Sequence, residues 1–469
     1  MSYRRRFHFA KESAARKQAF VMYPIMFYVL SFAFFFSVTA PSLSASGGWA
    51  ATYGDDGSDR AISVQQTGDG GYIVAGETFS FGTGDGDVWI LKLKPGGIVE
   101  WQKTYGGVAR DWAQSVQQTG DGGYIVAGET ESFGTGSGDF WVLKLSPDGT
   151  VEWEKAYGGV DYDRAYSIKQ TGDGGYIVAG ETTSYGAGHY DSLVLKLGPD
   201  GTVQWQKTYG GVAFECANFI QQTSDGGYIV AGETMSFGAG IDDFWVLKLS
   251  ADGTVEWEKT YGGDSFDEAN SIEQTGDGGY IVAGETMSFG AGKGDVWILK
   301  LSADGTVEWE KTYGGVYGDR AYSIQQTGDV GYIVACWTAS FGAGIDDFWV
   351  LKLGPDGDVE WQKTYGGVHY EWAYSIQQTG DGGYIMAGEA VSFGLGVAAQ
   401  EACILKLSPD GSINPSCYRI IILDTTVSGK DSSATVGTSS ADVSNTNARP
   451  QDSSAIIQDT DVPANILCR

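Results

Sequence analysis

The chain has 469 residues, of which 30 are Lys or Arg and 59 are Asp or Glu, so that its formal net charge is −29. Such an acidic surface repels phosphate groups and excludes nucleic-acid binding. The content of 42% hydrophobic and 13% aromatic residues excludes disorder over the bulk of the chain, and the scarcity of proline (10 residues) beside 71 glycines excludes collagen.

The first segment of the chain, residues 1–45, has the pattern of an export signal. Six basic residues and one acidic residue precede an apolar run over 25–38, and small residues follow. This order is typical of a signal peptide that is cleaved after Ala40 or Ala45, and a proline directly after Ala40 favours Ala45. The alternative is an uncleaved membrane anchor, because residues 20–40 are just long enough to span a bilayer. In both cases we expect a secreted or cell-surface protein that meets a membrane only through this segment.

A repeat of 52 residues occupies most of the chain. The motif Tyr-Gly-[Gly/Asp] recurs every 52 residues, and a tryptophan four residues before its tyrosine recurs as strictly. The tyrosines are Tyr53, Tyr105, Tyr157, Tyr209, Tyr261, Tyr313 and Tyr365. Each unit contains four short β segments, separated by the tight-turn sequences Gly-Asp-Gly-Gly and Pro-Asp-Gly and by one glycine-rich loop. Four antiparallel strands repeated seven times predict an all-β, seven-bladed β-propeller over residues 46–416.

The two ends of the repeat array predict how the ring closes. The seventh unit lacks its fourth strand, because the sequence beyond Gly411 no longer follows the repeat. Residues 47–54 match the fourth strand of the first unit, residues 99–106, position for position. We therefore expect the N-terminal strand to pair into the last blade. A solenoid would need polar capping repeats instead, and the sequence has none.

The repeated motifs resemble those of a known class of proteins. The pattern Tyr-Gly-Gly … Gly-Gly-Tyr-Ile-Val-Ala-Gly-x-Thr … Asp-x-x-[Val/Ile]-Leu-Lys-Leu … Trp-x-Lys-Thr is similar to the secreted β-propeller repeats of bacteria and archaea over about residues 48–413. The resemblance implies an exported, surface-associated or multidomain protein of mostly unassigned activity, and it carries over no catalytic residues. Residues 147–153 also resemble the repeats of pyrroloquinoline-quinone dehydrogenases, but those have eight blades, and their calcium and cofactor site is not recognisable.

The tail, residues 417–469, differs in composition from the repeats. It is rich in Ser, Thr, Asp, Ala and Val, and a second period, of seven residues, begins at Asp424. Its apolar side chains are too few and too small for a coiled coil, so that we expect an extended, weakly β-structured or disordered stalk. Cys417 and Cys468 bracket the tail, and we hypothesise that they form a disulfide in an oxidising compartment. The other cysteines fall in different repeats without metal-ligand spacing: Cys216, Cys336 and Cys403.

Two rings of carboxylates are expected on one face, which we call the long-loop face because the blade-to-blade loops and the glycine-rich loops form it. The first ring consists of Asp59, Asp111, Asp163, Glu215, Asp267, Asp319 and Glu371. The second consists of Asp87, Asp139, Asp191, Asp243, Asp295, Asp347 and Glu401. Carboxylates suit Ca²⁺, the one cofactor that the sequence suggests. Because a residue that every blade repeats generally serves blade structure, we favour the alternative that each carboxylate fixes its own loop.

Residues that depart from the repeat are the candidates for ligand binding, because a binding site must break the seven-fold symmetry. The positions beside the first carboxylate ring vary, and they include arginines and aromatic residues. The candidates are Arg60, Trp112, Tyr162, Arg164, Phe214, Tyr317, Arg320, Tyr370 and Trp372. Stacking on aromatic rings and bidentate hydrogen bonds from arginine suit a glycan or a protein ligand. Neutral drift on a solvated rim is the alternative.

Motifs for catalysis are scarce. Outside the N-terminal segment the histidines are His189 and His369, which occupy non-equivalent repeat positions, and no nucleophile–His–acid motif is present. The sequence therefore predicts an extracellular binding or adhesion module for a glycan or a protein. A secreted polysaccharide-active enzyme is one alternative, because the carboxylate rings offer many pairs of acids. A structural spacer of the envelope without its own ligand is the other.

Overall fold

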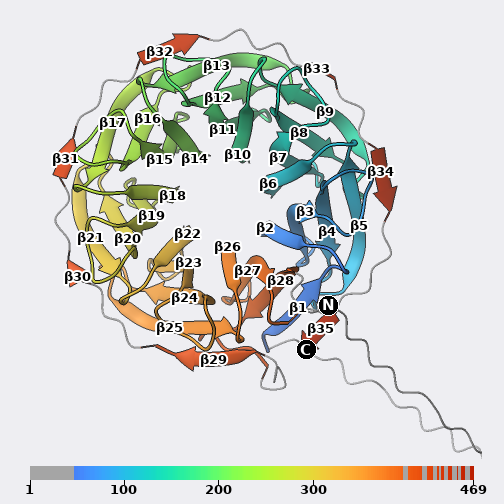
Figure 1. Ribbon diagram of the computed structural model, residues 1–469, viewed down its shortest axis with the longest axis vertical. Helices are drawn as coiled ribbons and strands as arrows, with labels where there is room; N and C mark the ends of the chain where they lie inside the picture. The colour runs from blue at the N-terminus through green and yellow to red at the C-terminus, as the bar shows by residue number, and fades with distance from the viewer. Residues whose placement is uncertain are drawn as a thin grey trace, which may run out of the picture. The chain divides into compact units, whose positions relative to one another are not determined.

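The computed structural model describes residues 47–393, 400–414 and 420–425, and six short strands between residues 430 and 468. In these residues seven five-stranded sheets are arranged as blades around a central channel (Figure 1). None of the described segments is a helix of the length and apolarity that crossing a membrane requires. The arrangement confirms the predicted seven-bladed β-propeller. The predicted export segment, residues 1–45, lies outside the described residues.

Four strands of each blade follow the order of the repeat, from the channel outwards. The innermost strands are β2 (Asp59–Gln66), β6 (Asp111–Gln118), β10 (Asp163–Gln170), β14 (Glu215–Gln222), β18 (Asp267–Gln274), β22 (Asp319–Gln326) and β26 (Glu371–Gln378). The second strands are β3 (Tyr72–Thr78), β7 (Tyr124–Thr130), β11 (Tyr176–Thr182), β15 (Tyr228–Thr234), β19 (Tyr280–Thr286), β23 (Tyr332–Thr338) and β27 (Tyr384–Ala390). We number the blades 1 to 7 in this order.

The third and fourth strands complete the blades towards the outside. The third strands are β4 (Asp87–Leu93), β8 (Asp139–Leu145), β12 (Asp191–Leu197), β16 (Asp243–Leu249), β20 (Asp295–Leu301), β24 (Asp347–Leu353) and β28 (Glu401–Leu407). The fourth strands of blades 1 to 6 are β5 (Val99–Gly106), β9 (Val151–Tyr157), β13 (Val203–Gly210), β17 (Val255–Gly262), β21 (Val307–Tyr313) and β25 (Val359–Gly366). In blade 7 the fourth strand is β1 (Trp49–Tyr53), which pairs antiparallel with β28. The predicted closure by the N-terminal strand is thus confirmed.

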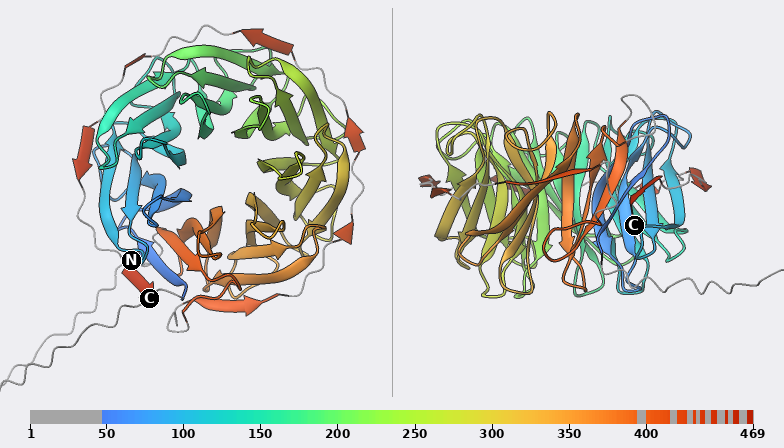
Figure 2. Two further views of the ribbon diagram at one scale, coloured as in Figure 1. Left: turned by 180° about the vertical axis from the view of Figure 1, so that it is seen from behind. Right: turned by 90° about the horizontal axis from the view of Figure 1, so that it is seen from below.

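The tail forms a fifth strand on the outer edge of every blade, where we had expected a stalk (Figures 1 and 2). We call these strands the belt. In chain order they are β29 (Ile421–Asp424), β30 (Lys430–Asp431), β31 (Thr435–Gly437), β32 (Asp442–Asn445), β33 (Gln451–Asp452), β34 (Ile456–Asp459) and β35 (Asn465–Cys468). They pair with blades 6, 5, 4, 3, 2, 1 and 7, so that the belt runs against the order of the blades. The fourth strand of each blade would otherwise leave its backbone groups unpaired at an open edge.

The repeated Trp-x-x-x-Tyr motif joins each blade to the next one. The hydroxyl of Tyr105, on the fourth strand of blade 1, donates to the carbonyl of Gly149 in a turn of blade 2 (2.6 Å). Trp101 lies edge-on to Tyr124 of blade 2, with ring centres 5.9 Å apart. The corresponding hydroxyl of Tyr53 donates to Gly97 in blade 1 (2.6 Å), so that the same contact also crosses the closure.

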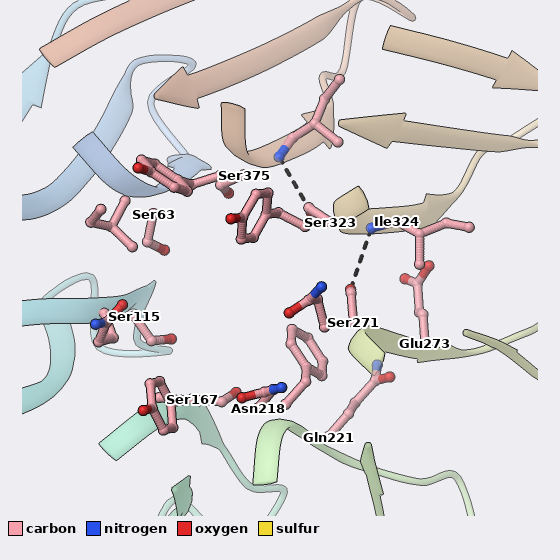
Figure 3. A pocket seen from close by; sticks show the side chains of 18 of the residues that line it. Ser63, Ser115, Ser167, Asn218, Gln221, Ser271, Glu273, Ser323, Ile324 and Ser375 are labelled. Carbon is pink, nitrogen blue, oxygen red and sulfur yellow. Dashed lines mark hydrogen bonds between the residues drawn. The ribbon is translucent and has the colours of Figure 1, made fainter. Parts of the chain in front are cut away.

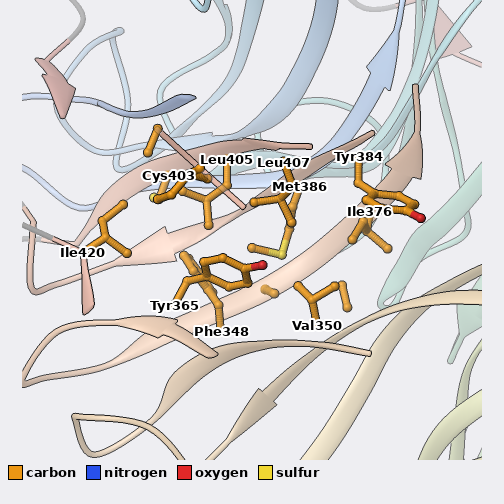
Figure 4. Packing of buried hydrophobic residues seen from close by; sticks show 14 of the residues in the cluster. Phe348, Val350, Tyr365, Ile376, Tyr384, Met386, Cys403, Leu405, Leu407 and Ile420 are labelled. Atoms are coloured by element: carbon orange, nitrogen blue, oxygen red, sulfur yellow. The ribbon is translucent and has the colours of Figure 1, made fainter. Parts of the chain in front are cut away.

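Apolar side chains pack between neighbouring blades, because the second and third strands are buried on both faces. Each of the seven hydrophobic clusters joins two blades. Figure 4 shows the cluster between blades 6 and 7, where Phe348, Met386 and Leu405 meet. Ile420, directly before the belt, is 5% exposed and belongs to the same cluster, so that the beginning of the belt is anchored in the core.

Candidate binding site at the channel mouth

Two rings of polar side chains line the channel and join its inner strands. In the first, a serine accepts a backbone N–H from the next blade, as Ser63 does from Val116 (3.2 Å). In the second, a glutamine side-chain oxygen does the same, as Gln65 does from Gln118 (2.6 Å). The serine ring of the channel consists of Ser63, Ser115, Ser167, Ser271, Ser323 and Ser375, and Figure 3 shows these serines around the open centre.

Both rings change around blade 4, although Glu273 still accepts the backbone N–H of Gln326 as a glutamine would. Phe219 takes the serine position of blade 4, and Lys169 and Glu273 take the glutamine positions of blades 3 and 5. The Lys169 Nζ lies 5.0 Å from the centre of the Phe219 ring. Burial lowers the pKa of Lys169 and raises the pKa of Glu273 to about 7, although the two opposite charges counteract both shifts. The channel is therefore asymmetric on the side of blade 4.

The first carboxylate ring fixes the loops of the long-loop face. Asp111 is fully buried and accepts hydrogen bonds from the Ser132 hydroxyl (2.6 Å), the Gly107 N–H (2.8 Å) and the Thr130 hydroxyl. Burial raises its pKa, and these hydrogen bonds counteract the shift. The contacts support the favoured interpretation, in which a carboxylate in every blade holds its own loop.

The second carboxylate ring makes equivalent contacts one loop further along. Asp139 is buried and accepts the backbone N–H groups of Thr135 (3.0 Å) and Gly136 (3.1 Å). Burial raises its pKa to about 6. Within the described ranges no three His, Cys, Asp or Glu side chains are grouped so as to hold a metal ion. Calcium binding stays a prediction.

Arginines at the mouth form ion pairs with glutamates of the second strands. Arg164 Nε lies 2.6 Å from Glu129 Oε2, and Arg60 Nε lies 2.8 Å from Glu389 Oε2. In each pair the arginine comes from the blade that follows the glutamate, and the glutamate side chain is at most 2% exposed. These two predicted arginines therefore join neighbouring blades.

Trp112, Tyr162 and Arg164 lie together between blades 2 and 3. The Arg164 guanidinium carbon lies 5.0 Å from the Trp112 ring centre and 5.1 Å from that of Tyr162. The Tyr162 hydroxyl donates to Glu129 (2.8 Å). Trp112 is only 6% exposed, because Arg110 and Arg164 lie over it. It supports the arginines and offers little surface for stacking.

The remaining predicted residues lie at other points around the mouth. Phe214 contacts Tyr190 (ring centres 5.3 Å apart), and Trp372 donates to Asp346 (2.9 Å) with Tyr370 at 6.3 Å. Tyr317 is 54% exposed. Arg320 bonds to Glu268 and lies 3.5 Å from Glu285. The nine predicted residues therefore form several groups.

Two cavities open at the mouth on either side of blade 4. The first has a volume of about 560 Å³ and lies between blades 3 and 4. Its lining consists of Tyr162, Arg164, Tyr166, Glu181, Tyr190 and Phe214. The second has a volume of about 140 Å³ and lies between blades 4 and 5, with Glu233, Asp242 and Glu268 in its wall. Three of the nine predicted residues thus line the first cavity, and Arg320 lines the second.

Sequence reasoning missed several residues of these cavities. Glu181 and Glu233 belong to the Gly-Glu-Thr motif and were passed over because nearly every unit repeats it. Tyr190 and Asp242 directly precede the second carboxylate ring, at a position where three units have glycine and blade 6 has Asp346. The sequence could have indicated both positions. Only the structure shows that Tyr190 lies beside Phe214 in the first cavity and Asp242 beside Glu268 in the second.

One comparison with known proteins, the match to a family model, supports the β-propeller fold. The model of a family described as "Domain of unknown function (DUF5122) beta-propeller" matches residues 171–203. No curated protein matches the chain in sequence.

Three solved structures are similar at 12% identity. Sqt1 from Chaetomium thermophilum has a TM-score of 0.42, with 72% of this chain and 81% of that one covered. The Vibrio (V.) cholerae biofilm matrix protein Bap1 has a TM-score of 0.28, with 79% and 88% covered. A subtype N11 neuraminidase-like protein of A/flat-faced bat/Peru/033/2010 has a TM-score of 0.31, with 64% and 89% covered. The repeats, the family match and the seven blades together show a β-propeller repeat protein.

Proposed function

We propose that the protein is an exported binding module that holds a glycan or protein ligand over the channel mouth at blades 3 to 5. One observation carries the proposal: the substitutions in the two polar rings of the channel and the two cavities at its mouth all lie around blade 4. Phe219 interrupts the serine ring there, and the two cavities flank the same blade. A binding site must break the symmetry of a ring, whereas a spacer has no need to.

The larger cavity supports this assignment by its size and its lining. A volume of about 560 Å³ lies within the range of roughly 300–1,000 Å³ that is common for ligand pockets. Phe214 and Tyr190 supply aromatic faces, and Arg164 is fixed by its ion pair with Glu129. Aromatic faces beside fixed polar groups suit a sugar ring or a protein side chain.

The export part of the proposal rests on the basic, apolar and small-residue order of residues 1–45. The cysteines of the blades are consistent with it, because Cys216, Cys336 and Cys403 are buried, and burial raises the pKa of each thiol. Such thiols react slowly in an oxidising compartment. N-terminal sequencing of the protein recovered from culture medium is expected to begin at Ser46 or Pro41.

The ligand assignment is tested on a glycan array and on immobilised cell-surface protein, with the exported protein as probe. The double variant Tyr190→Ala with Phe214→Ala is expected to lose binding by about tenfold or more. Ile98→Ala is the matched control, since Ile98 is 43% exposed in a turn on the opposite face. Equal binding by the double variant and the control would overturn the site.

The same preparation tests the two alternatives from the sequence. Release of reducing ends from a polysaccharide would identify an enzyme. A protein that neither binds to the arrays nor releases sugar would be a structural spacer.

A further inference from the structure

Four of the six glutamates of the second strands pair with an arginine of the next blade. These four are Glu77, Glu129, Glu285 and Glu389. In blade 6 the glutamate is replaced by Trp337, and the facing residue in blade 7 is Trp372, not an arginine. A glutamate at this place is thus generally matched by a cationic donor.

Two glutamates are exceptions. Glu181 of blade 3 faces Cys216 and accepts a hydrogen bond from the Tyr166 hydroxyl (2.9 Å). The second exception is Glu233 of blade 4. The residue that faces it from blade 5 is Glu268, a second carboxylate at the position where other blades have Arg60, Arg164 or Arg320. Glu268 itself bonds to Arg320. Within the described residues Glu233 has no ion-pair partner of its own. Burial, together with the negative charges of Glu268 and Asp242, raises the pKa of Glu233, and the positive charge of Arg320 counteracts the shift.

Asp242 lacks a donor for the same reason. It is 4% exposed, and its Oδ1 atom is buried without a hydrogen-bond partner in the described part of the chain. At the equivalent position of blade 6, Asp346 accepts a hydrogen bond from the Trp372 indole (2.9 Å). Trp372 is the counterpart of Glu268, so that the residue that serves as donor in blade 7 is an acceptor in blade 5.

The cavity of about 140 Å³ between blades 4 and 5 is lined by these three carboxylates, by Glu285 and by Arg320. Arg320 pairs with Glu268 and Glu285, so that one positive charge stands against four carboxylates. The cavity is smaller than the pockets that take whole ligands, roughly 300–1,000 Å³, and therefore suits the end of one side chain. The carboxylates are not grouped to hold a metal ion in the described residues. A group with several N–H donors and a positive charge would satisfy them.

We infer that this cavity is a subsite for a guanidinium or primary ammonium group, supplied by an arginine or lysine side chain of a protein ligand. The inference rests on the proposed function and names the chemistry of one contact. The cationic group of the ligand would lie beside Glu233 as Arg164 lies beside Glu129 between blades 2 and 3.

The rim of the cavity favours a protein over a free amine. Ile241, Phe266 and Met287 are 50%, 41% and 47% exposed, and Phe266 and Met287 also line the cavity. Methionine and aromatic residues around a polar centre are typical of protein–protein contacts. Charge complementarity adds to this, because a protein with formal net charge −29 attracts a basic partner.

The test uses N-acetyl-arginine amide, and a peptide with one arginine between apolar residues, titrated into the full protein. Both probes are expected to bind, the peptide about tenfold more tightly, and the peptide with citrulline for arginine is expected not to bind. Glu268→Arg supplies the donor found in other blades. This variant is expected to bind the arginine peptide about tenfold more weakly, or weaker still. Its melting temperature shows that it is folded.

Equal binding of the arginine and citrulline peptides, or unchanged binding by Glu268→Arg, would overturn the subsite. Equal affinity of the small probe and the peptide, or tighter binding of chitosan oligomers, would overturn the protein source. The double variant Tyr190→Ala with Phe214→Ala is expected to retain N-acetyl-arginine amide. Loss of glycan or protein binding thus reports on the cavity between blades 3 and 4. Loss of N-acetyl-arginine amide binding reports on the subsite.

Discussion

The blade framework and the channel mouth at blade 4 are built from the same repeat but use it differently. In the framework one residue makes the same contact in successive blades, as Tyr53 and Tyr105 do with the turn of the next blade. At the mouth Glu268 occupies the position where Arg164 forms an ion pair. We expect stability to depend on the repeated positions, and we propose that ligand binding depends on the departures. The predictions below test that division.

Deletion of the tail, residues 417–469, which contains the belt, is expected to have the largest effect on stability. It leaves the outer edge of each blade unpaired, and open edges pair with other chains. We expect aggregation, or a monomer whose melting temperature is lower by roughly 10 °C or more. Size-exclusion chromatography and calorimetry measure the two outcomes. A monodisperse protein with unchanged melting temperature would show that the belt is dispensable.

Removal of a framework carboxylate is expected to cost more stability than the same change at the mouth. Asp163 accepts hydrogen bonds from Ser184 (2.7 Å), Gly159 (2.7 Å) and Thr182. Asp163→Ala leaves these buried donors unpaired and is expected to cost about 2–4 kcal/mol.

Asp242→Ala is the matched variant, because Asp242 is equally buried but its Oδ1 has no partner. We expect it to cost less than about 1 kcal/mol or to stabilise the protein. Urea denaturation measures both variants, and equal losses would contradict the division.

The disulfide between Cys417 and Cys468 stays a prediction, because Cys417 and the side chain of Cys468 lie outside the described residues. Their chain neighbours support it: the Asn414 N–H donates to Gly48, and Cys468 pairs with Ala50 two residues further along β1. Reduction is expected to cost about 2–4 kcal/mol. Intact mass without reductant, and peptide mapping, are expected to show the linked pair, and two free thiols would contradict it.

Stability is expected to be higher near pH 5 than near pH 8. Burial raises the pKa of Asp139 and of Asp347 to about 6 and that of Glu273 to about 7. These groups are protonated more readily in the folded state, so that their contribution is present at low pH and is lost as the pH rises through 6 to 7.

A second pH limit is expected in acid. Although slight burial opposes it, hydrogen bonds from Thr119 and Lys144 lower the pKa of Asp121 to about 2. Its contribution is present above the ordinary pKa of aspartate and is lost as the pH falls towards 2. Melting temperatures between pH 3 and pH 8 test both limits, and a steady rise from pH 5 to pH 8 would contradict the first.

A small effect is also expected at a departure outside the mouth. Val330 occupies a turn position that is glycine in other blades, and it has a φ of 70°. A β-branched residue is strained in this region. Val330→Gly is expected to stabilise the protein by about 1 kcal/mol and to leave ligand binding unchanged. A loss of stability in urea would show that Val330 makes compensating contacts.

Sequence reasoning predicted the blades because their signals are local. The turn glycines, the apolar second and third strands and the match of residues 47–54 to 99–106 required no knowledge of the structure. The belt was not predicted as such, because its strands pair through backbone groups and its composition resembles that of a disordered segment. Its period of seven residues was visible, but the edges that it pairs with were not.

The candidate site was predicted only in part, for a related reason. Arg164 and Phe214 depart from the repeat and could be singled out. That Arg164 is neutralised by Glu129, and that Glu233 lacks such a partner, depends on contacts between blades. A departure from the repeat therefore marks a candidate position in the sequence. The contacts with the next blade decide whether the side chain there already has a partner.

The reverse course of the belt has a consequence for the order of folding. β1 is made first, yet its partner β28 is made only after six blades. The strand that covers blade 1, β34, is among the last residues of the chain. During synthesis, and during any passage through a membrane, the outer edge strand of each blade stays unpaired until its belt strand has been made. An unfinished chain that is released early would lack this segment, and its open edges could pair with the belt of a complete chain.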